Sequence, residues 1–246
     1  MLLPRSASLN WHLPSLCRVC GAWPARSDLG ACHACWARWG PSQHRCLTCA
    51  RPLSPPATRC GACMRHPPPL DLSMAAVDYA FPWSHWAVAL KQEAHRGLAR
   101  PMGAMLAATW RRHAKPADVT EWLWTAVPLH PRKWRQRGFN PAWALALASQ
   151  GLDDGLEHRT VELLQRLHWR VDQHQLPLSR RALEVADAFA LHPQAHRHWR
   201  AHQGVVLVDD VMTTGATLHA CARAIAEQHQ GPIVGLVFAR TPPRSG

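Results

Sequence analysis

The second half of the chain alternates short apolar runs with longer segments whose apolar residues recur at helical spacing. The apolar runs predict strands at 75–81, 123–127, 205–208 and 233–238. The other segments predict helices at 84–112, 142–150 and 216–228; Gly97 and Pro101 weaken the first of them. Asn140 followed by Pro141 predicts the start of the helix at 142–150. Strands that alternate with helices predict an α/β domain with a parallel sheet flanked by helices.

The cysteines separate this domain from an N-terminal segment of different composition. Eight of the nine cysteines lie between Cys17 and Cys63. Residues 51–70 hold six prolines, and the three consecutive ones at 67–69 form a stiff spacer. We therefore expect a domain boundary near residue 70, with a cysteine-rich domain at 1–70 and the α/β domain at 71–246.

The N-terminal cysteines form four Cys-x-x-Cys pairs. Two residues between cysteines let both sulfurs reach one ion, and zinc binds four ligands in a tetrahedron. The pairs therefore predict two structural zinc sites, built from Cys17, Cys20, Cys32, Cys35, Cys46, Cys49, Cys60 and Cys63. Joining neighbouring pairs is the simplest assignment, but the spacing also fits a cross-braced one, which joins the first pair to the third and the second to the fourth. Disulfides and an iron–sulfur cluster are the alternatives to zinc.

The charge of the chain widens the range of expected partners. A formal net charge of +12 favours polyanions such as nucleic acid and phosphorylated metabolites, and a basic surface without function is the alternative. The N-terminal residues lack the apolar core of a signal peptide, and no apolar run is long enough to span a membrane. We expect a cytoplasmic protein without membrane insertion, in which thiols stay reduced.

One segment of the α/β domain predicts a phosphate site. The strand at 205–208 is followed by Asp209 and Asp210 and then by a Thr-Thr-Gly-Ala-Thr stretch that opens a helix. At the carboxyl end of a parallel strand, the N–H groups of such a loop and helix can converge on a phosphate. Two carboxylates beside it suit ribose hydroxyls or Mg²⁺. The alternative is a capped loop without a ligand; the P-loop and dinucleotide-binding glycine motifs are absent.

A second segment supplies cationic side chains after another predicted strand. Arg132, Lys133, Arg135 and Arg137 precede Gly138. Four cationic groups on one loop can neutralise a pyrophosphate. A solvated basic turn is the alternative.

The Asp-Asp-Val-Met-Thr-Thr-Gly-Ala-Thr stretch resembles the phosphoribosyl-pyrophosphate signature of type I phosphoribosyltransferases. The resemblance implies that Asp209 and Asp210 contact the 2- and 3-hydroxyls of the ribose. It also implies that the 5-phosphate is bound by Thr213, Thr214, Gly215, Ala216 and Thr217.

Three further features resemble the ComF family (competence protein F, with the GntX-like proteins) over about residues 15–240. They are the paired cysteines, the Arg-Gly-Phe-Asn stretch at 137–140, and Gln173, Leu176, Arg181 and Phe189. The resemblance implies a type I phosphoribosyltransferase fold with a hood at about 153–200, preceded by a double zinc ribbon. Glu184 departs from the family pattern, which usually has asparagine at that position.

The resemblance implies an enzyme that transfers a phosphoribosyl group, with Asp209, Asp210 and Arg137 as catalytic candidates. Arg135, Arg137 and Gly138 would hold the pyrophosphate together with Mg²⁺. The family link also implies a role in DNA uptake or the use of external DNA, with a sugar phosphate and other DNA-uptake proteins as partners. An alternative is a single-stranded DNA-handling protein with a non-catalytic ribose-phosphate site, which the charge and 13 tryptophans allow. A transcription regulator ranks last, because no helix-turn-helix is recognisable.

Overall fold

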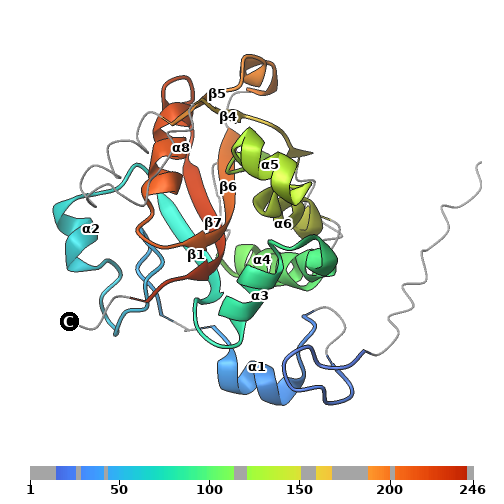
Figure 1. Cartoon of the computed structure of the whole chain (residues 1–246). Coiled ribbons are helices and arrows are strands. Elements are labelled where there is room, and N and C mark those ends of the chain that lie inside the picture. Colours follow the sequence, from blue (N-terminus) through green and yellow to red (C-terminus); the bar gives the residue numbers. More distant parts are fainter. Residues whose placement is uncertain are drawn as a thin grey trace, which may run out of the picture. The chain divides into compact units, whose positions relative to one another are not determined.

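The computed structural model describes residues 15–25, 29–41, 44–113, 121–150, 159–167, 188–199 and 203–242 (Figure 1). The chain divides into two compact units, Met1–Gly40 and Pro41–Gly246. The first unit holds two cysteine pairs and helix α1 (His33–Trp39). The second holds the other two pairs, helix α2 (Gly61–Arg65) and the α/β sheet. The boundary near residue 70 stays a prediction, while the contacts group the later cysteine pairs with the sheet.

Five parallel strands form the sheet in the order β1-β7-β6-β2-β3. Their bounds are β1 (Leu72–Asp78), β2 (Glu121–Ala126), β3 (Arg159–Thr160), β6 (Gln203–Met212) and β7 (Ile233–Arg240). The central strand β6 pairs with β7 from Val205↔Ile233 to Met212↔Arg240. The predicted α/β class with a parallel sheet is confirmed.

Helices cover both faces of the sheet. On one side lie α3 (Trp83–Ala89), α4 (Ala99–His113) and α6 (Pro141–Gln150), and on the other lies α8 (Ala216–Ala226) (Figure 1). Among the described helices, none is both long and apolar enough to cross a membrane.

The burial of β6 on both faces explains its continuous apolar sequence. Val205 and Leu207 belong to one buried cluster with Cys221 of α8. Because side chains alternate along a strand, Val206 and Val208 face the side of α4 and α6. A strand covered on both faces is expected to be apolar at every position.

The predicted helix at 84–112 is interrupted. α3 ends at Ala89, the 3-10 helix η1 (Glu93–Leu98) follows, and α4 begins at Ala99. The break includes Gly97, and Pro101 occupies the first turn of α4, where a missing backbone N–H breaks no helical hydrogen bond. The prediction of one continuous helix was therefore wrong.

The region predicted as a hood contributes a two-stranded antiparallel sheet, β4 (Leu164–Arg166) and β5 (Phe189–Leu191), and the 3-10 helix η3 (Ala195–His198). Phe189 is buried in the same cluster as α8. The predicted hood residues Gln173, Leu176, Arg181 and Glu184 lie outside the described residues.

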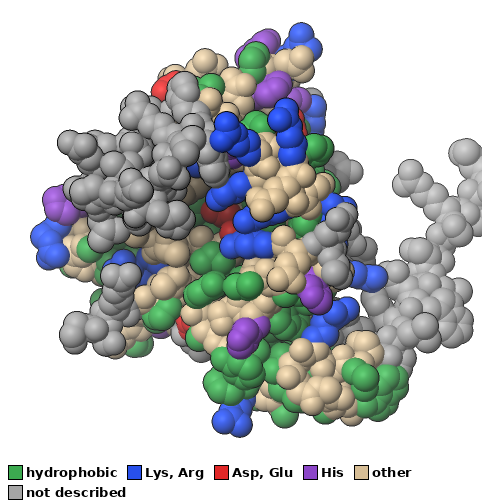
Figure 2. All heavy atoms as spheres, in the orientation of Figure 1, with side chains coloured by type: hydrophobic (Ala, Val, Ile, Leu, Met, Phe, Trp, Pro, Cys, Tyr) green, Lys and Arg blue, Asp and Glu red, His purple; other side chains and the backbone are tan. Residues whose placement is uncertain are grey.

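The face drawn in Figure 2 carries an uneven distribution of charge. Lys and Arg side chains gather over the region of β6 and helix α5 (Pro131–Arg137), around a small patch of acidic side chains (Figure 2). This region lies at the carboxyl end of the central strand, where parallel sheets bind their ligands.

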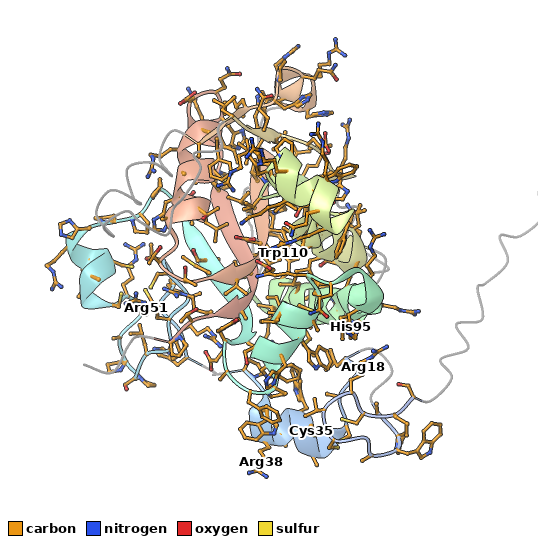
Figure 3. All side chains as sticks on the ribbon, viewed as in Figure 1. Arg18, Cys35, Arg38, Arg51, His95 and Trp110 are labelled. Atoms are coloured by element: carbon orange, nitrogen blue, oxygen red, sulfur yellow. The ribbon has the colours of Figure 1, made fainter. Side chains whose placement is uncertain are left out.

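Three tryptophans pack together on one side of the sheet. Trp110 of α4 contacts Trp122 and Trp124 of β2 edge-on, with ring centroids 4.9 and 5.6 Å away. Trp110 and Trp124 are buried, and Figure 3 shows Trp110 close to the sheet. These aromatic side chains contribute to core packing.

Candidate functional site

Asp209 and Asp210 lie within β6. The strand continues to Met212 instead of ending at Val208, where the sequence predicted its end. The backbone N–H of Asp210 donates a hydrogen bond to Asp209 Oδ1 at 2.8 Å. Burial, followed by the negative charge of Asp210, raises the pKa of Asp209 well above its usual range. Asp209 therefore retains a proton to higher pH than an ordinary aspartate does.

Lys91 neutralises the second acid of the pair. Its Nζ lies 3.0 Å from Asp210 Oδ2, and the Asp210 side chain is only 14% exposed. Partial burial strengthens such an ion pair relative to one in water. Lys91 follows the C-cap of α3, so it comes from a different part of the chain than Asp210. Sequence analysis did not identify this lysine.

The basic segment before Gly138 is a helix, so the prediction of a loop was wrong. Pro131 occupies the first turn of α5, and His130 caps the helix by accepting a hydrogen bond from the N–H of Arg132 at its Nδ1, at 3.1 Å. Proline suits the first turn of a helix because its missing N–H has no partner there. Gly138 ends the helix with φ at 72°.

The helical form sorts the four cationic side chains into two groups. Lys133 and Arg137, four residues apart, are half-buried and lie on one face of α5. Arg132 and Arg135 are exposed. Among the residues predicted to hold pyrophosphate, Arg137 thus belongs to the half-buried group and Arg135 to the exposed group.

Lys133 belongs to a cluster of cations beside the acid pair. Burial lowers its pKa, as do the charges of Arg137, Arg166 and Lys91, while Asp210 opposes these effects. These cationic side chains repel one another, and together they create a strongly positive local potential. A highly charged anion bound among them would relieve the repulsion.

Arg166 of β4 connects the cluster to Asp209. Burial lowers the pKa of Arg166, while the negative charge of Asp209 acts in the opposite direction. Its guanidinium also lies over the ring of Phe189, 5.1 Å from the centroid. Arg166 was not identified from the sequence; its position follows only from the folding of β4 against β5.

The 213–217 segment joins the end of β6 to α8. Thr213 and Thr214 are exposed, and α8 begins at Ala216 after Gly215. Gly215 adopts φ of 88°, and Thr214 Oγ1 accepts a hydrogen bond from the N–H of Ala216 at 3.3 Å. The start of an eleven-residue helix at the end of a central parallel strand suits an anion.

His219 lies one turn into α8 beneath this segment. Burial lowers its pKa to about 4, and the charges of Arg223 and Arg240 act in the same direction. The imidazole is therefore neutral at neutral pH and adds no positive charge to the 213–217 segment. The positive electrostatic potential there comes from the N-terminus of α8 and from Arg223 and Arg240.

A cavity of about 610 Å³ is bounded by α5, α6 and β4. Its apolar lining includes Trp134, Phe139, Trp143 and Leu147, and its polar lining includes Asn140, Glu162, Gln165, Arg166 and His192. Arg166, which lines the cavity, is also within reach of the charge of Asp209. A cavity with aromatic walls and a few polar groups suits a small planar molecule.

The Arg-Gly-Phe-Asn stretch connects the cavity wall to the sheet. Asn140 Nδ2 donates to the carbonyl of Val127 at 2.9 Å, and Asn140 Oδ1 accepts from the N–H of Ala142 at 3.0 Å. The predicted capping role of Asn140 is confirmed. Phe139 lies under the guanidinium of Arg96, 4.4 Å from the ring centroid.

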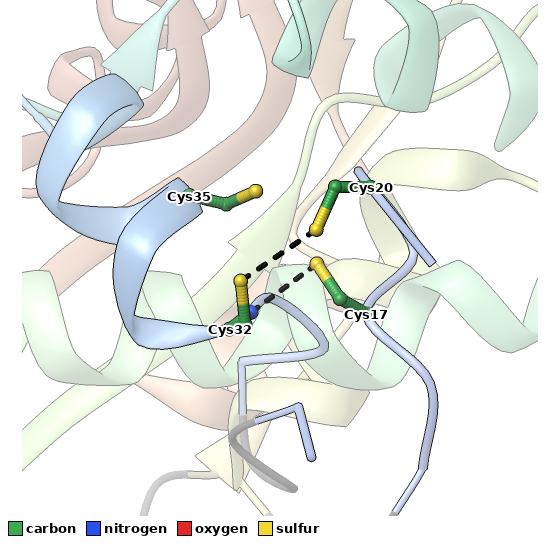
Figure 4. A group of neighbouring side chains, drawn as sticks. All are labelled: Cys17, Cys20, Cys32 and Cys35. Carbon is green, nitrogen blue, oxygen red and sulfur yellow. Dashed lines mark hydrogen bonds between the residues drawn. The ribbon is translucent and has the colours of Figure 1, made fainter. Parts of the chain in front are cut away.

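The cysteines form two clusters of four, each built from neighbouring pairs. One contains Cys17, Cys20, Cys32 and Cys35 (Figure 4), and the other Cys46, Cys49, Cys60 and Cys63. The neighbour assignment therefore holds and the cross-braced one does not. In both clusters all four sulfurs lie within 4.8 Å of one another.

The spacing of the sulfurs fits zinc. Zn–S bonds of about 2.3 Å in a tetrahedron place the sulfurs roughly 3.8 Å apart. The Sγ atoms of Cys20 and Cys32 are 3.7 Å apart, and those of Cys49 and Cys60 are 3.8 Å apart. Disulfide sulfurs would lie about 2.05 Å apart, and all these cysteines are free. With four protein ligands at each site, the zinc sites are structural.

Backbone N–H groups favour the thiolate form that zinc binds. Cys17 Sγ accepts a hydrogen bond from Cys32 N at 3.2 Å, and Cys46 Sγ from Cys60 N at 3.3 Å. Burial opposes ionisation of Cys17 and Cys46, but hydrogen bonds from backbone N–H groups outweigh it and lower the pKa of each thiol to about 6. A lowered pKa makes a thiol a better metal ligand near neutral pH.

Comparison with known proteins identifies relatives along most of the chain. Residues 8–64 match the double zinc ribbon domain. The DNA utilization protein YhgH of Escherichia coli O6:H1 is 29% identical over 93% of this chain and 98% of its own length. YhgH of Salmonella typhimurium is 27% identical over the same shares, and Competence protein F of Haemophilus influenzae is 28% identical over 73% of this chain and 77% of its own length. Among solved structures, TT1426 from Thermus thermophilus aligns with 60% of this chain and 85% of its own at 18% identity and a TM-score of 0.31.

Proposed function

We propose that this chain, as a homologue of the YhgH proteins and of Competence protein F, belongs to the ComF family. We further propose that it binds phosphoribosyl pyrophosphate or a related ribose phosphate at the carboxyl end of β6. The observation that carries this proposal is the arrangement of the acid pair, the cations and the 213–217 segment around one strand end. Asp210 is held by Lys91, while Lys133 supplies a further cation beside it. Such a site combines groups for a sugar with groups for phosphates.

The proposal assigns each group a part of the ligand. The 213–217 segment and the N-terminus of α8 receive the 5-phosphate. Asp209 and Asp210 form hydrogen bonds with the ribose hydroxyls. Asp209 can both donate and accept a hydrogen bond while its carboxyl group is protonated. Lys133 and Arg137 receive the pyrophosphate. Mg²⁺ enters as the magnesium complex of this substrate, because Lys91 already compensates the charge of Asp210.

A phosphoribosyl transfer at this site would place the acceptor in the adjoining cavity. The bond from the ribose C1 to the pyrophosphate oxygen breaks, and the bonding electrons leave with pyrophosphate. The acceptor forms a new bond to C1 and loses a proton. Lys133 and Arg137 would stabilise the negative charge that develops on pyrophosphate. The aromatic walls formed by Trp134 and Trp143 suit a planar acceptor.

Isothermal titration with phosphoribosyl pyrophosphate and Mg²⁺ tests the binding. We expect saturable binding by the wild-type protein and a loss of at least about tenfold in affinity for Arg137→Met. Arg65→Met is the matched control, since Arg65 is an exposed arginine at the end of α2. The absence of binding at millimolar ligand would end the proposal.

Binding of single-stranded DNA is the second candidate, favoured by the exposed side chains of α5. Arg132 and Arg135 are exposed there, as is Trp134, whose side chain is 54% exposed. Exposed cations beside an aromatic ring can pair with phosphates and stack on bases. Fluorescence anisotropy of an oligonucleotide against salt tests this candidate, since phosphate contacts predict affinity that falls steeply with salt. No binding at low salt would exclude it.

The same relatives support a place for this chain in the use of external DNA. The names of those proteins refer to DNA utilization and to competence. We propose that the ribose-phosphate site serves that process here. Deletion of the gene, followed by growth or transformation assays with added DNA, tests the proposal. Complementing the deletion strain with the Arg137→Met variant then shows whether the ribose-phosphate site, and not only the presence of the protein, is needed.

A further inference from the structure

Arg240 is a buried arginine at the end of β7. It is 1% exposed. Its Nε donates to the carbonyl of Cys49 at 2.7 Å. Its Nη1 donates to the carbonyls of Met212 at 2.9 Å, of Thr213, and of Thr241 at 2.9 Å. One guanidinium thus contacts both the second cysteine cluster and the first residue after β6.

These hydrogen bonds control the orientation of two peptide units. In a planar trans peptide, the C=O of one residue and the N–H of the next point in opposite directions. Because the carbonyls of Met212 and Thr213 point at Arg240, the N–H groups of Thr213 and Thr214 point away from it. The Met212 carbonyl also accepts a hydrogen bond from the N–H of Thr241 at 3.1 Å. Arg240 therefore adds a side-chain contact to each of these two carbonyls and helps to hold the direction of the first backbone donors of the 213–217 segment.

The other contact of Arg240 is made with a metal-ligand loop. Cys49 contributes both its carbonyl to Arg240 and its sulfur to the second cluster. Ala50, which follows it, has φ of 55° and its carbonyl accepts from Arg45 Nη1 at 3.1 Å. Arg45 also pairs with Asp78 at the end of β1, at 2.8 Å. The loop that carries Cys49 is thereby attached to the sheet at two points.

Charge gives a second reason why the metal site and Arg240 depend on each other. Four thiolates and one Zn²⁺ carry a formal charge of −2. A buried guanidinium needs hydrogen-bond acceptors and nearby negative charge, because desolvation is otherwise costly. A loaded cluster supplies that charge and also fixes the position of the Cys49 carbonyl.

We infer that Arg240 is a positioning residue that couples the second cysteine cluster to the 213–217 segment, so that loading of this cluster with zinc orders the segment. The inference rests on the proposed function only in treating that segment as the anion site. The coupling concerns the second cluster, whose Cys49 carbonyl accepts the Arg240 hydrogen bond.

Hydrogen exchange of the ligand-free protein tests the coupling without using any substrate. Cys60→Ser removes a ligand from the second cluster, and Cys20→Ser is the matched change in the first. Zinc content by mass spectrometry should fall from two ions per chain to one in each variant. We expect peptides covering 213–217 to exchange about tenfold faster in Cys60→Ser and at the wild-type rate in Cys20→Ser.

Arg240→Lys tests the same link from the other side. Lysine keeps the charge but lacks the planar fork that reaches Cys49 and Met212 together. The variant should keep two zinc ions and still show faster exchange at 213–217. If Arg240→Lys does not fold, zinc can instead be removed stepwise from the wild-type protein with a chelator. The exchange rate at 213–217 should then rise when the second cluster loses its zinc ion.

The outcomes separate this inference from the proposed function. Equal exchange at 213–217 in Cys60→Ser and Cys20→Ser would overturn the coupling, even in a protein that binds phosphoribosyl pyrophosphate. Faster exchange in Cys60→Ser alone, with a larger increase at 213–217 than in peptides of β1 and β2, would support the coupling, even if titration showed no such binding. The two ideas are thus tested by independent measurements.

Discussion

Lys91 Nζ lies 3.0 Å from Asp210 Oδ2, which joins the segment after α3 to the carboxyl end of the central strand. The pair brings a cation from one side of the sheet to the acids of β6. It also decides the charge of the candidate site, because an uncompensated Asp210 would repel a phosphate.

Replacing Lys91 with methionine should weaken ribose-phosphate binding. The change leaves the Asp210 charge without its partner and removes one cation of the cluster, so we expect a loss of at least about tenfold in affinity. Titration calorimetry measures the change, with Arg65→Met as the control for net charge. Unchanged affinity in Lys91→Met would contradict the assigned role of the ion pair.

Asp209→Asn should change how stability depends on pH. The pKa of Asp209 is raised in the folded state, so the folded protein binds more protons than the unfolded one above the usual aspartate pKa. The stability contributed by Asp209 is therefore present at low pH and lost as pH rises through the raised pKa. Asparagine keeps an acceptor for the Asp210 N–H and carries no charge.

The expected result is that Asp209→Asn is more stable than the wild type at neutral pH, by on the order of 1 kcal/mol, with the difference shrinking toward pH 4. Urea unfolding at a series of pH values measures this. A difference that stays constant from pH 4 to 8 would show that Asp209 does not titrate abnormally.

Loss of the second zinc site should destabilise the sheet unit more than loss of the first. Cys46, Cys49 and Cys63 belong to the same buried cluster as Val205 and Leu207. We expect Cys63→Ser to lower the melting temperature, followed by tryptophan fluorescence, by at least several degrees. In a chain of this size, each kcal/mol lost from the free energy of unfolding lowers the melting temperature by about 2–4 °C. Cys35→Ser is the matched control, and an equal effect of both variants would contradict this prediction.

Gly215→Ala should destabilise the protein by about 1–2 kcal/mol. Gly215 has φ of 88°, and an added Cβ would lie 2.7 Å from Met212 Cε and 2.8 Å from His219 Nε2. The strain arises mainly from the backbone conformation, since the methionine end can move. Gly97→Ala is the control because no atom lies within 4 Å of its Cβ position. Denaturant unfolding that gave the same stability for both variants would count against a special role of Gly215.

The sequence supported the architecture better than it supported the details of the site. Alternation of apolar runs and helical patterns predicted the parallel sheet, because burial on both faces demands continuous apolar strands such as that of β6. The end of β6 was predicted too early, since polar residues at Asp209 and Asp210 imitate the start of a loop. The basic segment was interpreted as a loop although Pro131 suits a helix start.

Three determinants of the candidate site had no signal in the sequence. Lys91 and Arg166 are single cations in segments far from Asp209, and only the packing of α3 and β4 brings them to the strand end. Arg240 lies at the end of an apolar strand, where its hydrogen bonds to Cys49 and Met212 depend on three separate segments meeting. Such contacts are long-range and leave no local periodicity.

By itself the sequence determined the eight cysteine ligands, the parallel α/β class and the position of the acid-threonine segment after a buried strand. These features follow from local rules: cysteine spacing limits which sulfurs reach one ion, and apolar periodicity selects strands and helices. Only the tertiary structure decided that neighbouring cysteine pairs join and that Lys91 compensates Asp210. It also decided that Arg240 ties the second cluster to the segment after β6. The physical reason is that charge pairing and buried hydrogen bonds depend on distance in space, which the order of residues along the chain does not specify.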